Sequence, residues 1–123
     1  MKELIIAVTV LLAIFGASVY TNKNIKEGSR TLVNKLEVLK EDISKDDASK
    51  SAKEIYKEWE KISKNWSVMI LHNELDLIET SLIRMKSSIS SSELQRATEE
   101  IDVAIFLLGH IVEKERLSIK NIF

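Results

Sequence analysis

Residues 48–69, ASKSAKEIYKEWEKISKNWSVM, carry the clearest structural pattern in this chain. Their apolar members are spaced alternately by four and three positions without interruption, which places them on one face of an α-helix. The spacing therefore predicts a helix that is buried along one seam. The seam consists of Ala48, Ala52, Ile55, Trp59, Ile62, Trp66 and Met69.

Three further segments show the same helical spacing, one before residue 48 and two after residue 69. Each predicts an amphipathic helix, and short connectors between such helices are typical of an antiparallel bundle. The three stripes are Ile25, Leu32, Leu36, Leu39 and Ile43; Leu71, Leu75, Ile78, Leu82, Met85 and Ile89; and Leu94, Ala97, Ile101, Ala104, Leu108 and Ile111.

Polar residues indicate where the helices end. Residues 42–47 interrupt the first stripe, and Asp46 or Asp47 is expected to cap the next helix. Ser92 lies in a serine-rich connector and is spaced from Gln95 as in a capping box. Gly109 is expected to loosen the last helix, and an apolar tail is expected to pack back on the bundle. The tail consists of Leu117, Ile119, Ile122 and Phe123.

The turn after the seam has two candidate positions between Lys64 and Asn73. At residues 64–67, Asn65 tolerates a left-handed cap and Ser67 can start a helix. At residues 72–73, Asn73 with Asp76 resembles a capping box. We favour the first position because it leaves helices of similar length. A continuous helix whose apolar face drifts is the third interpretation.

The N-terminal segment MKELIIAVTVLLAIFGASVYTNKN, residues 1–24, is apolar. Seventeen residues from Leu4 to Tyr20 carry no charge, and they span about 26 Å as a helix. Extension through Asn22 gives a length that crosses a bilayer, with Tyr20 at the interface. We therefore expect a transmembrane signal anchor at residues 1–22 and a helical bundle domain at residues 23–123.

A cleaved secretory signal peptide is the alternative for this segment. Cleavage after Ser18 would place Gly16 and Ser18 at the recognised positions, which match the A-x-A-like pattern imperfectly. The apolar run is also longer than the usual core of a signal peptide. We favour an uncleaved anchor for both reasons.

The orientation of the anchor rests on two opposing signals. Lys23, Lys26 and Arg30 lie after the apolar run, and the positive-inside rule alone would place the C-terminal part in the cytoplasm. A head of only three residues before the run favours translocation of the C-terminal part. We expect a single-pass protein of the cell membrane with its helical domain outside the cytoplasm.

Composition supports an all-α chain and excludes several classes of site. Proline and cysteine are both absent from the 123 residues, and the 18 basic residues are balanced by 19 acidic ones. Without cysteine there is no disulfide, thiolate metal site or thiol nucleophile. Balanced charge gives no broad basic footprint, so we expect no nucleic-acid partner.

Two histidines are the candidates for chemistry. His72 and His110 each precede acidic residues, and antiparallel helices could bring them together as part of a metal site. Each lies beside its apolar stripe, however, and no Glu-x-x-His motif of di-iron bundles occurs. We interpret both as half-buried structural polar positions. We expect no catalytic residue, no metal and no cofactor.

Helix 48–69 carries two other patterns. Five lysines lie along one face, but acidic residues accompany them, which predicts a solvated surface rather than a lipid- or partner-binding one. Trp59 and Trp66 belong to the seam, which predicts core packing rather than an aromatic ligand surface. The lysines are Lys50, Lys53, Lys57, Lys61 and Lys64.

Four segments of the chain resemble a known family. They are the N-terminal anchor, DDASKSAKEIYKEW, ILHNELDLIETSLIRMKS and FLLGHIVEKERLSIKNIF. The chain is similar to uncharacterised, membrane-anchored helical proteins of endospore-forming Gram-positive bacteria, a family defined by a domain of unknown function. The resemblance implies an uncleaved anchor and an extracytoplasmic helical part, and it implies no activity.

The expected function is therefore non-catalytic. We expect a membrane-tethered accessory or binding partner of a multi-spanning membrane protein, with the bilayer and a membrane protein or a second copy as partners. Ala13, Gly16 and Ala17 form a flat face on the anchor where a neighbouring helix can approach. The alternative is an extracytoplasmic sensor or small-ligand-binding bundle.

Overall fold

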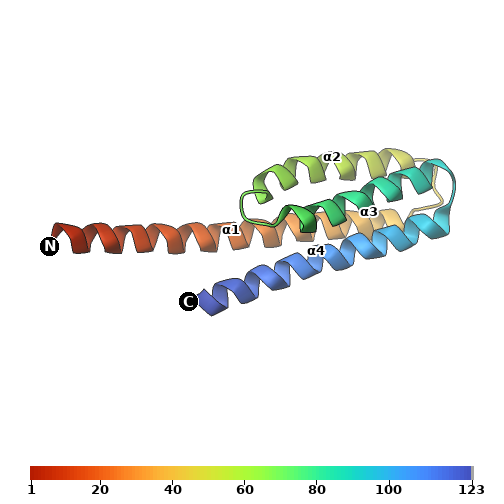
Figure 1. Ribbon diagram of the computed structural model, residues 1–123. Helices are drawn as coiled ribbons and strands as arrows, with labels where there is room; N and C mark the ends of the chain where they lie inside the picture. The colour runs from red at the N-terminus through yellow and green to blue at the C-terminus, as the bar shows by residue number, and fades with distance from the viewer. Residues whose placement is uncertain (123) are drawn as a thin grey trace.

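The chain forms four α-helices, as shown by the computed structural model (Figure 1). The structure describes the backbone of residues 1–122 and the side chains of residues 1–117 and of Lys120. The helices are α1 (Lys2–Glu41), α2 (Ala48–Trp66), α3 (His72–Ser90) and α4 (Leu94–Ile122). The predicted all-α fold, a long apolar N-terminal helix and a bundle of four helices, is confirmed.

The helices run up and down and pack in a ring, in which each helix contacts the next and α4 contacts α1. The connectors α1–α2 and α3–α4 lie at one end of the bundle, and the α2–α3 connector lies at the other end, where α1 leaves it (Figure 1). We call these the distal end and the stem end. The part of α1 before residue 25 projects beyond the stem end, and we call it the stem.

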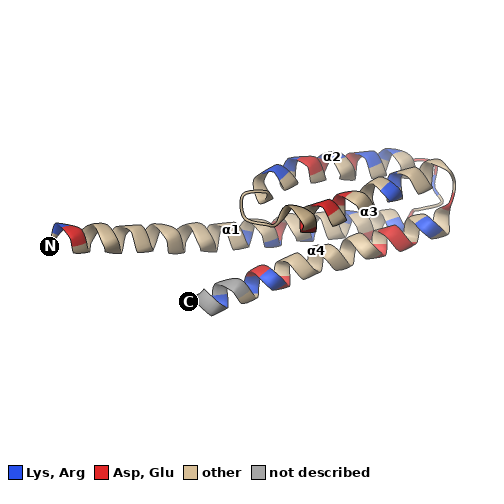
Figure 2. Ribbon diagram, in the orientation of Figure 1, with Lys and Arg blue, Asp and Glu red and all other residues tan. Residues whose placement is uncertain are grey.

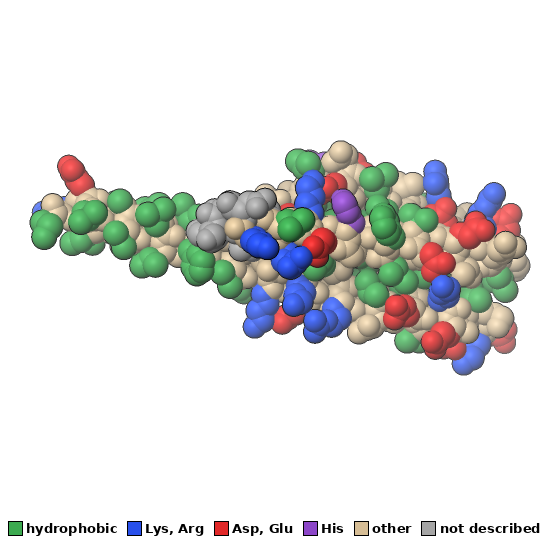
Figure 3. Space-filling model, turned by 90° about the horizontal axis from the view of Figure 1, so that it is seen from below, with side chains coloured by type: hydrophobic (Ala, Val, Ile, Leu, Met, Phe, Trp, Pro, Cys, Tyr) green, Lys and Arg blue, Asp and Glu red, His purple; other side chains and the backbone are tan. Residues whose placement is uncertain are grey.

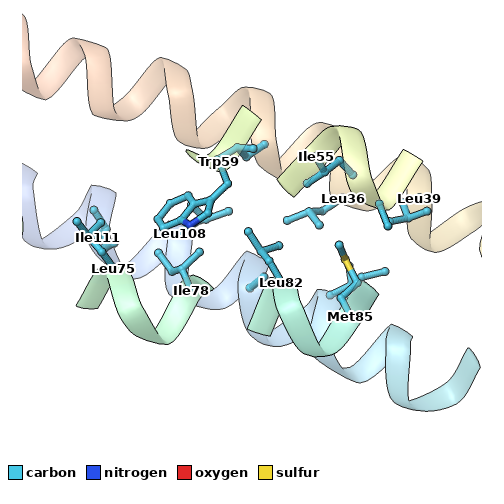
Figure 4. Packing of buried hydrophobic residues seen from close by; sticks show 14 of the residues in the cluster. Leu36, Leu39, Ile55, Trp59, Leu75, Ile78, Leu82, Met85, Leu108 and Ile111 are labelled. Atoms are coloured by element: carbon cyan, nitrogen blue, oxygen red, sulfur yellow. The ribbon is translucent and has the colours of Figure 1, made fainter. Parts of the chain in front are cut away.

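The core runs along the axis of the bundle and is made from the predicted stripes (Figure 4). Leu36, Trp59, Ile78 and Leu108 are each at most 1% exposed. Both tryptophans are buried, with ring centroids 5.9 Å apart in an edge-to-face arrangement. The prediction that they supply core packing is confirmed. The five lysines of α2 are exposed.

Two predicted seam positions are wrong because they fall in the α2–α3 connector. This connector comprises residues 67–71. Met69 is 49% exposed and Leu71 is 62% exposed. Neither predicted turn position is correct in detail: Ser67 does not start α3, and α3 begins after Leu71 without a side-chain cap hydrogen bond. The connector lies between the two candidate positions.

The α3–α4 connector ends α3 with a Schellman motif, which corrects the predicted capping box. Ser92 has a φ of 59°. The Ser92 N–H donates to the Ile89 carbonyl and the Glu93 N–H donates to the Ser88 carbonyl, at 3.1 and 2.8 Å. This pattern satisfies the last carbonyls of α3. Ser92 is thus the left-handed cap of α3 rather than the N-cap of α4.

The remaining boundaries are partly as predicted. Residues 42–47 separate α1 from α2, and Asp47 precedes α2 without a side-chain cap hydrogen bond. α4 continues through Gly109 and to Ile122, so the predicted separate tail is wrong. Leu117 is 44% exposed. The predicted packing of the side chains of Ile119, Ile122 and Phe123 lies outside the described residues.

Candidate functional site

The stem is the most unusual surface of the molecule. Eleven large apolar side chains between Leu4 and Tyr20 are exposed, none less than 45%. Figure 3 shows hydrophobic side chains along the stem, and Figure 2 shows that no charge interrupts it between its first turn and the bundle. Of the described helices, α1 alone is long and apolar enough to cross a membrane, and none of its most apolar stretch is buried. By length and composition the segment can serve as a membrane anchor or a signal sequence.

The predicted small-residue face lies in the middle of the stem. Ala13, Gly16 and Ala17 are all exposed, and a Cβ atom added at Gly16 would meet no atom within 4 Å. The spacing of three and four residues places them on one helix face. Gly28 differs, because a Cβ there would lie 3.1 Å from Cζ2 of Trp66. The same helix thus has one glycine in open space and one at a close helix contact.

The histidines are more exposed than the sequence predicts. His72 is exposed at the first position of α3, and His110 is exposed on α4. The His110 ring stacks on Phe106 with centroids 6.3 Å apart. Within the part of the chain that the structure describes, no three His, Asp or Glu side chains gather where a metal ion could bind. Among the described side chains, neither imidazole therefore belongs to a group of three potential metal ligands.

Ion pairs join neighbouring helices along the bundle. Lys35 pairs with Glu58 between α1 and α2, and Lys40 pairs with Asp102 between α1 and α4 at 2.8 Å. Between α2 and α3, the Tyr56 hydroxyl donates to Glu79 at 3.4 Å. Burial, followed by the charges of Glu79 and Glu60, raises the pKa of Tyr56. Because the two ion pairs are exposed or half-buried, each adds little to stability.

Acidic and basic side chains of α3 and α4 pair toward the stem end. Lys114 on α4 pairs with Glu74 on α3 at 2.6 Å. Burial raises the pKa of the Glu115 carboxyl, the charge of Glu74 raises it further, and Lys114 lowers it. The hydrogen bond from Arg116 lowers the pKa of the neighbouring Glu113. The pKa values of Glu113 and Glu115, two residues apart on α4, are therefore shifted in opposite directions.

Several open grooves lie on the described part of the bundle. One of about 340 Å³ lies between α1 and α2, and one of about 260 Å³ lies between α3 and α4 beside Phe106. A third, of about 420 Å³, lies between the base of the stem and the α2–α3 connector. The buried Nε1 of Trp59 has no hydrogen-bond partner, but its neighbours in the core are apolar and offer no ligand chemistry (Figure 4).

The feature that sequence reasoning missed is the apolar character of the α2–α3 connector. Val68, Met69 and Leu71 are 83%, 49% and 62% exposed, whereas Ile70 between them is 5% exposed. No local signal marked it, because connectors usually consist of Gly, Pro, Asn, Asp and Ser, and residues 68–71 contain none of these. The helical spacing of the two flanking stripes instead assigned Met69 and Leu71 to the core, and it left out Ile70, which is buried.

Fold and surface together define the class: a small helical bundle carried on an exposed apolar N-terminal helix. Exposed apolar side chains are concentrated on the stem and in the α2–α3 connector at the stem end.

The chain belongs to the family described as "Domain of unknown function (DUF4363)", whose model matches residues 19–122. The match covers the whole bundle and begins at Val19, so most of the apolar stem precedes it. The predicted membership of a domain-of-unknown-function family is confirmed for this part of the chain. Comparison with curated proteins and with solved structures finds no match.

Proposed function

We propose that this protein is a non-catalytic, membrane-tethered helical bundle that acts as an accessory or binding partner of a multi-spanning membrane protein. The observation that carries the proposal is the exposure of the stem. A single helix supplies both the apolar stem and one wall of the bundle. The bundle would therefore stand directly on the membrane rather than hang from a flexible linker.

The stem is costly to keep in water, which supports its insertion into a membrane. Full burial of one large aliphatic or aromatic side chain contributes about 1.5–3 kcal/mol. Eleven such side chains, discounted by about half for shading within the helix, amount to on the order of 10 kcal/mol. This is comparable with the whole stability of a small domain. A bilayer removes that cost and satisfies the backbone of a helix at the same time.

An uncleaved anchor agrees better with the fold than a removed signal peptide. Val19 lies within α1, six residues before Ile25, the first α1 side chain in the core. Removal of residues 1–18 would leave the bundle intact but without an attachment. Retention would give a rigid connection from membrane to core. We infer retention from this continuity and from the imperfect cleavage site.

The bundle is proposed to lie outside the cytoplasm. The family resemblance supports this side, while the basic residues after the stem oppose it. A C-terminal tag should therefore be digested when intact protoplasts are treated with protease. A tag that stays protected until the membrane is permeabilised would place the bundle in the cytoplasm.

The partner role is tested by purification from membranes in mild detergent. Replacement of Ala13, Gly16 and Ala17 by leucine keeps the stem apolar but fills the small face, so insertion should persist while a partner or a second copy is lost. The matched control, Leu4→Ile with Leu11→Ile, changes apolar residues on the opposite face of the stem. If an unrelated anchor supports the same co-purification, the stem is a tether and partner recognition lies in the bundle.

A ligand-binding or sensory bundle is the second candidate, and one observation favours it. The groove of about 340 Å³ between α1 and α2 has Val38, Leu39 and Ile55 in its lining, together with polar residues. Its place at the distal end, away from the stem, would leave it open to small molecules. Val38 is an exposed lining residue of this groove. Saturable binding that is lost in Val38→Trp, which would fill the groove, would favour this function over the accessory role.

A further inference from the structure

The three connectors of the bundle differ in chemistry according to the end at which they lie. At the distal end, residues 42–47 contain three aspartates and residues 91–93 are Ser-Ser-Glu. At the stem end, residues 67–71 read Ser-Val-Met-Ile-Leu. Figure 1 shows that the apolar connector alone lies beside the stem. The difference depends on the position of the connector rather than on its length.

The apolar connector has a defined conformation that presents its side chains outward. The N–H groups of Met69 and Ile70 both donate to the Trp66 carbonyl at 2.9 Å. Ile70 is buried and holds the connector to the core. The side chains of Val68, Met69 and Leu71 therefore remain exposed because the turn is fixed, not because the segment fails to pack.

The connector lies level with the base of the stem. Tyr20, Thr21 and Asn24 of α1 line one groove together with Lys64, Val68 and Met69. Tyr20 is 71% exposed and is the last apolar residue of the stem. Tyrosine prefers the boundary between headgroups and acyl chains of a bilayer. A bilayer that surrounds the stem would reach the connector at the same depth.

Basic residues surround this junction. Lys23 and Lys26 lie just after the stem's apolar run, and Lys64 lies near the end of α2 beside the connector. Figure 3 shows Lys and Arg side chains gathered where the stem meets the bundle. Lysine near an exposed apolar segment suits a lipid surface, because its charge reaches the phosphates while apolar neighbours enter the interface.

We infer that residues 67–71 form a second membrane contact, in which Val68, Met69 and Leu71 enter the lipid interface beside the stem while Lys64 meets lipid phosphates. The inference rests on the proposed membrane insertion of the stem and goes beyond it. One helix alone leaves the bundle free to tilt, whereas two contacts on one leaflet fix its orientation. The distal end would then point away from the membrane.

Depth measurement in reconstituted vesicles tests this contact, and the absence of native cysteine makes single labelling sites clean. The full chain carries Val68→Cys with an environment-sensitive dye, in vesicles that contain phosphatidylglycerol and lipids spin-labelled near the headgroup. Leu12→Cys is the control inside the bilayer and Ser92→Cys is the control at the distal end. Flotation of each sample with the vesicles reports insertion of the stem separately.

We expect the dye at residue 68 to emit at shorter wavelength than at residue 92 and to be quenched by the shallow spin label, while residue 92 is unaffected. Met69→Ser with Leu71→Ser should reduce that quenching without loss of flotation. If the chain floats but residue 68 behaves like residue 92, the second contact is wrong and the anchor stands. If shielding at residue 68 disappears when protein is diluted at constant lipid, a second copy covers the connector and the lipid contact is wrong. If the chain does not float, both proposals fail.

Discussion

The two halves of α1 obey different rules although they are one uninterrupted helix. From Ile25 onward, the buried residues lie on the side that faces the rest of the bundle, and Leu32 and Leu36 are among them. Before residue 25, apolar side chains occupy every face and none is buried. Bundle-facing residues need one apolar stripe, whereas a helix surrounded by lipid needs apolar residues all round.

The distribution of apolar residues around a helix therefore records the surroundings for which it is suited. Leu12 and Leu36 are chemically identical, but Leu36 is buried in the protein core, whereas Leu12 is exposed on the stem. The same change in each half should have different consequences. Changes in the stem should alter attachment, and changes in the bundle half should alter folding.

The greatest change is expected from charge in the stem. Leu11→Lys with Leu12→Lys should remove the protein from the membrane, because each lysine near the centre of a spanning helix costs about 2.5–3.5 kcal/mol. Val38→Lys is the matched control, since Val38 is an exposed apolar residue in the bundle half of α1. Flotation with membranes measures the outcome. Equal recovery of both variants with membranes would contradict the claim that the stem, and not the bundle half of α1, attaches the protein to the membrane.

The next effect concerns loss of leucine side chains. Leu36→Ala leaves a cavity at a fully buried position and should lower the free energy of unfolding by about 2–5 kcal/mol. Leu12→Ala removes the same atoms from the stem and should leave bundle unfolding unchanged. Chemical denaturation in detergent, followed by tryptophan fluorescence, compares them. Similar midpoints for both variants would mean that the bundle half is not the folded half.

Glycine substitutions give a weaker contrast in the same helix. Gly28→Leu should destabilise the bundle by about 1–3 kcal/mol, because the added atoms meet the side chains of Trp66 and Ile62 and overpack the contact. Gly16→Leu enters open space and should leave unfolding unchanged. Thermal unfolding separates the two variants. A Gly28→Leu midpoint equal to that of the wild type would show that α1 and α2 are not in close contact there.

The weakest expected effect is the pH dependence of stability that arises from Glu113 and Glu115 on α4. The raised pKa of Glu115 means that its charged form destabilises the folded chain, so this cost grows as pH rises from the unfolded pKa through the folded one. Glu115→Gln should raise the unfolding midpoint at neutral pH and not at strongly acidic pH. Glu113, whose pKa is lowered, should show the opposite sign on substitution. Midpoint changes of the same sign for both substitutions would contradict the opposite pKa shifts of Glu113 and Glu115.

Much of this fold can be predicted from residue spacing alone. The stripes of α1 and α3 and most of the α2 seam supply the core because burial selects one face of each helix. Met69 and Leu71 were misassigned because helical spacing continued past the residue where the chain turns. Nothing local ends α2 at Trp66: the turn is set by the buried side chain of Ile70, which depends on tertiary packing.

The helix caps and the exposure of the histidines were predicted less well, because both depend on tertiary packing. Ser92 matches the spacing of a capping box, but in the fold it ends α3 in a left-handed conformation usually given to glycine. His72 and His110 lie beside apolar stripes, yet both are exposed, since burial of such border positions depends on how closely neighbouring helices approach. For the stem, the sequence already supplied the anchor hypothesis, and the structure adds that, among the described residues, none of its most apolar stretch is buried.

Retention of the stem can be measured from the intact mass of the chain recovered from carbonate-washed membranes. We predict that the protein remains in the membrane pellet as the full 123-residue chain of 14.0 kDa, because the stem is retained and continues into the bundle. A soluble chain that begins near Val19 would contradict this prediction, since the bundle would then work without the helix that is proposed to hold it at the membrane.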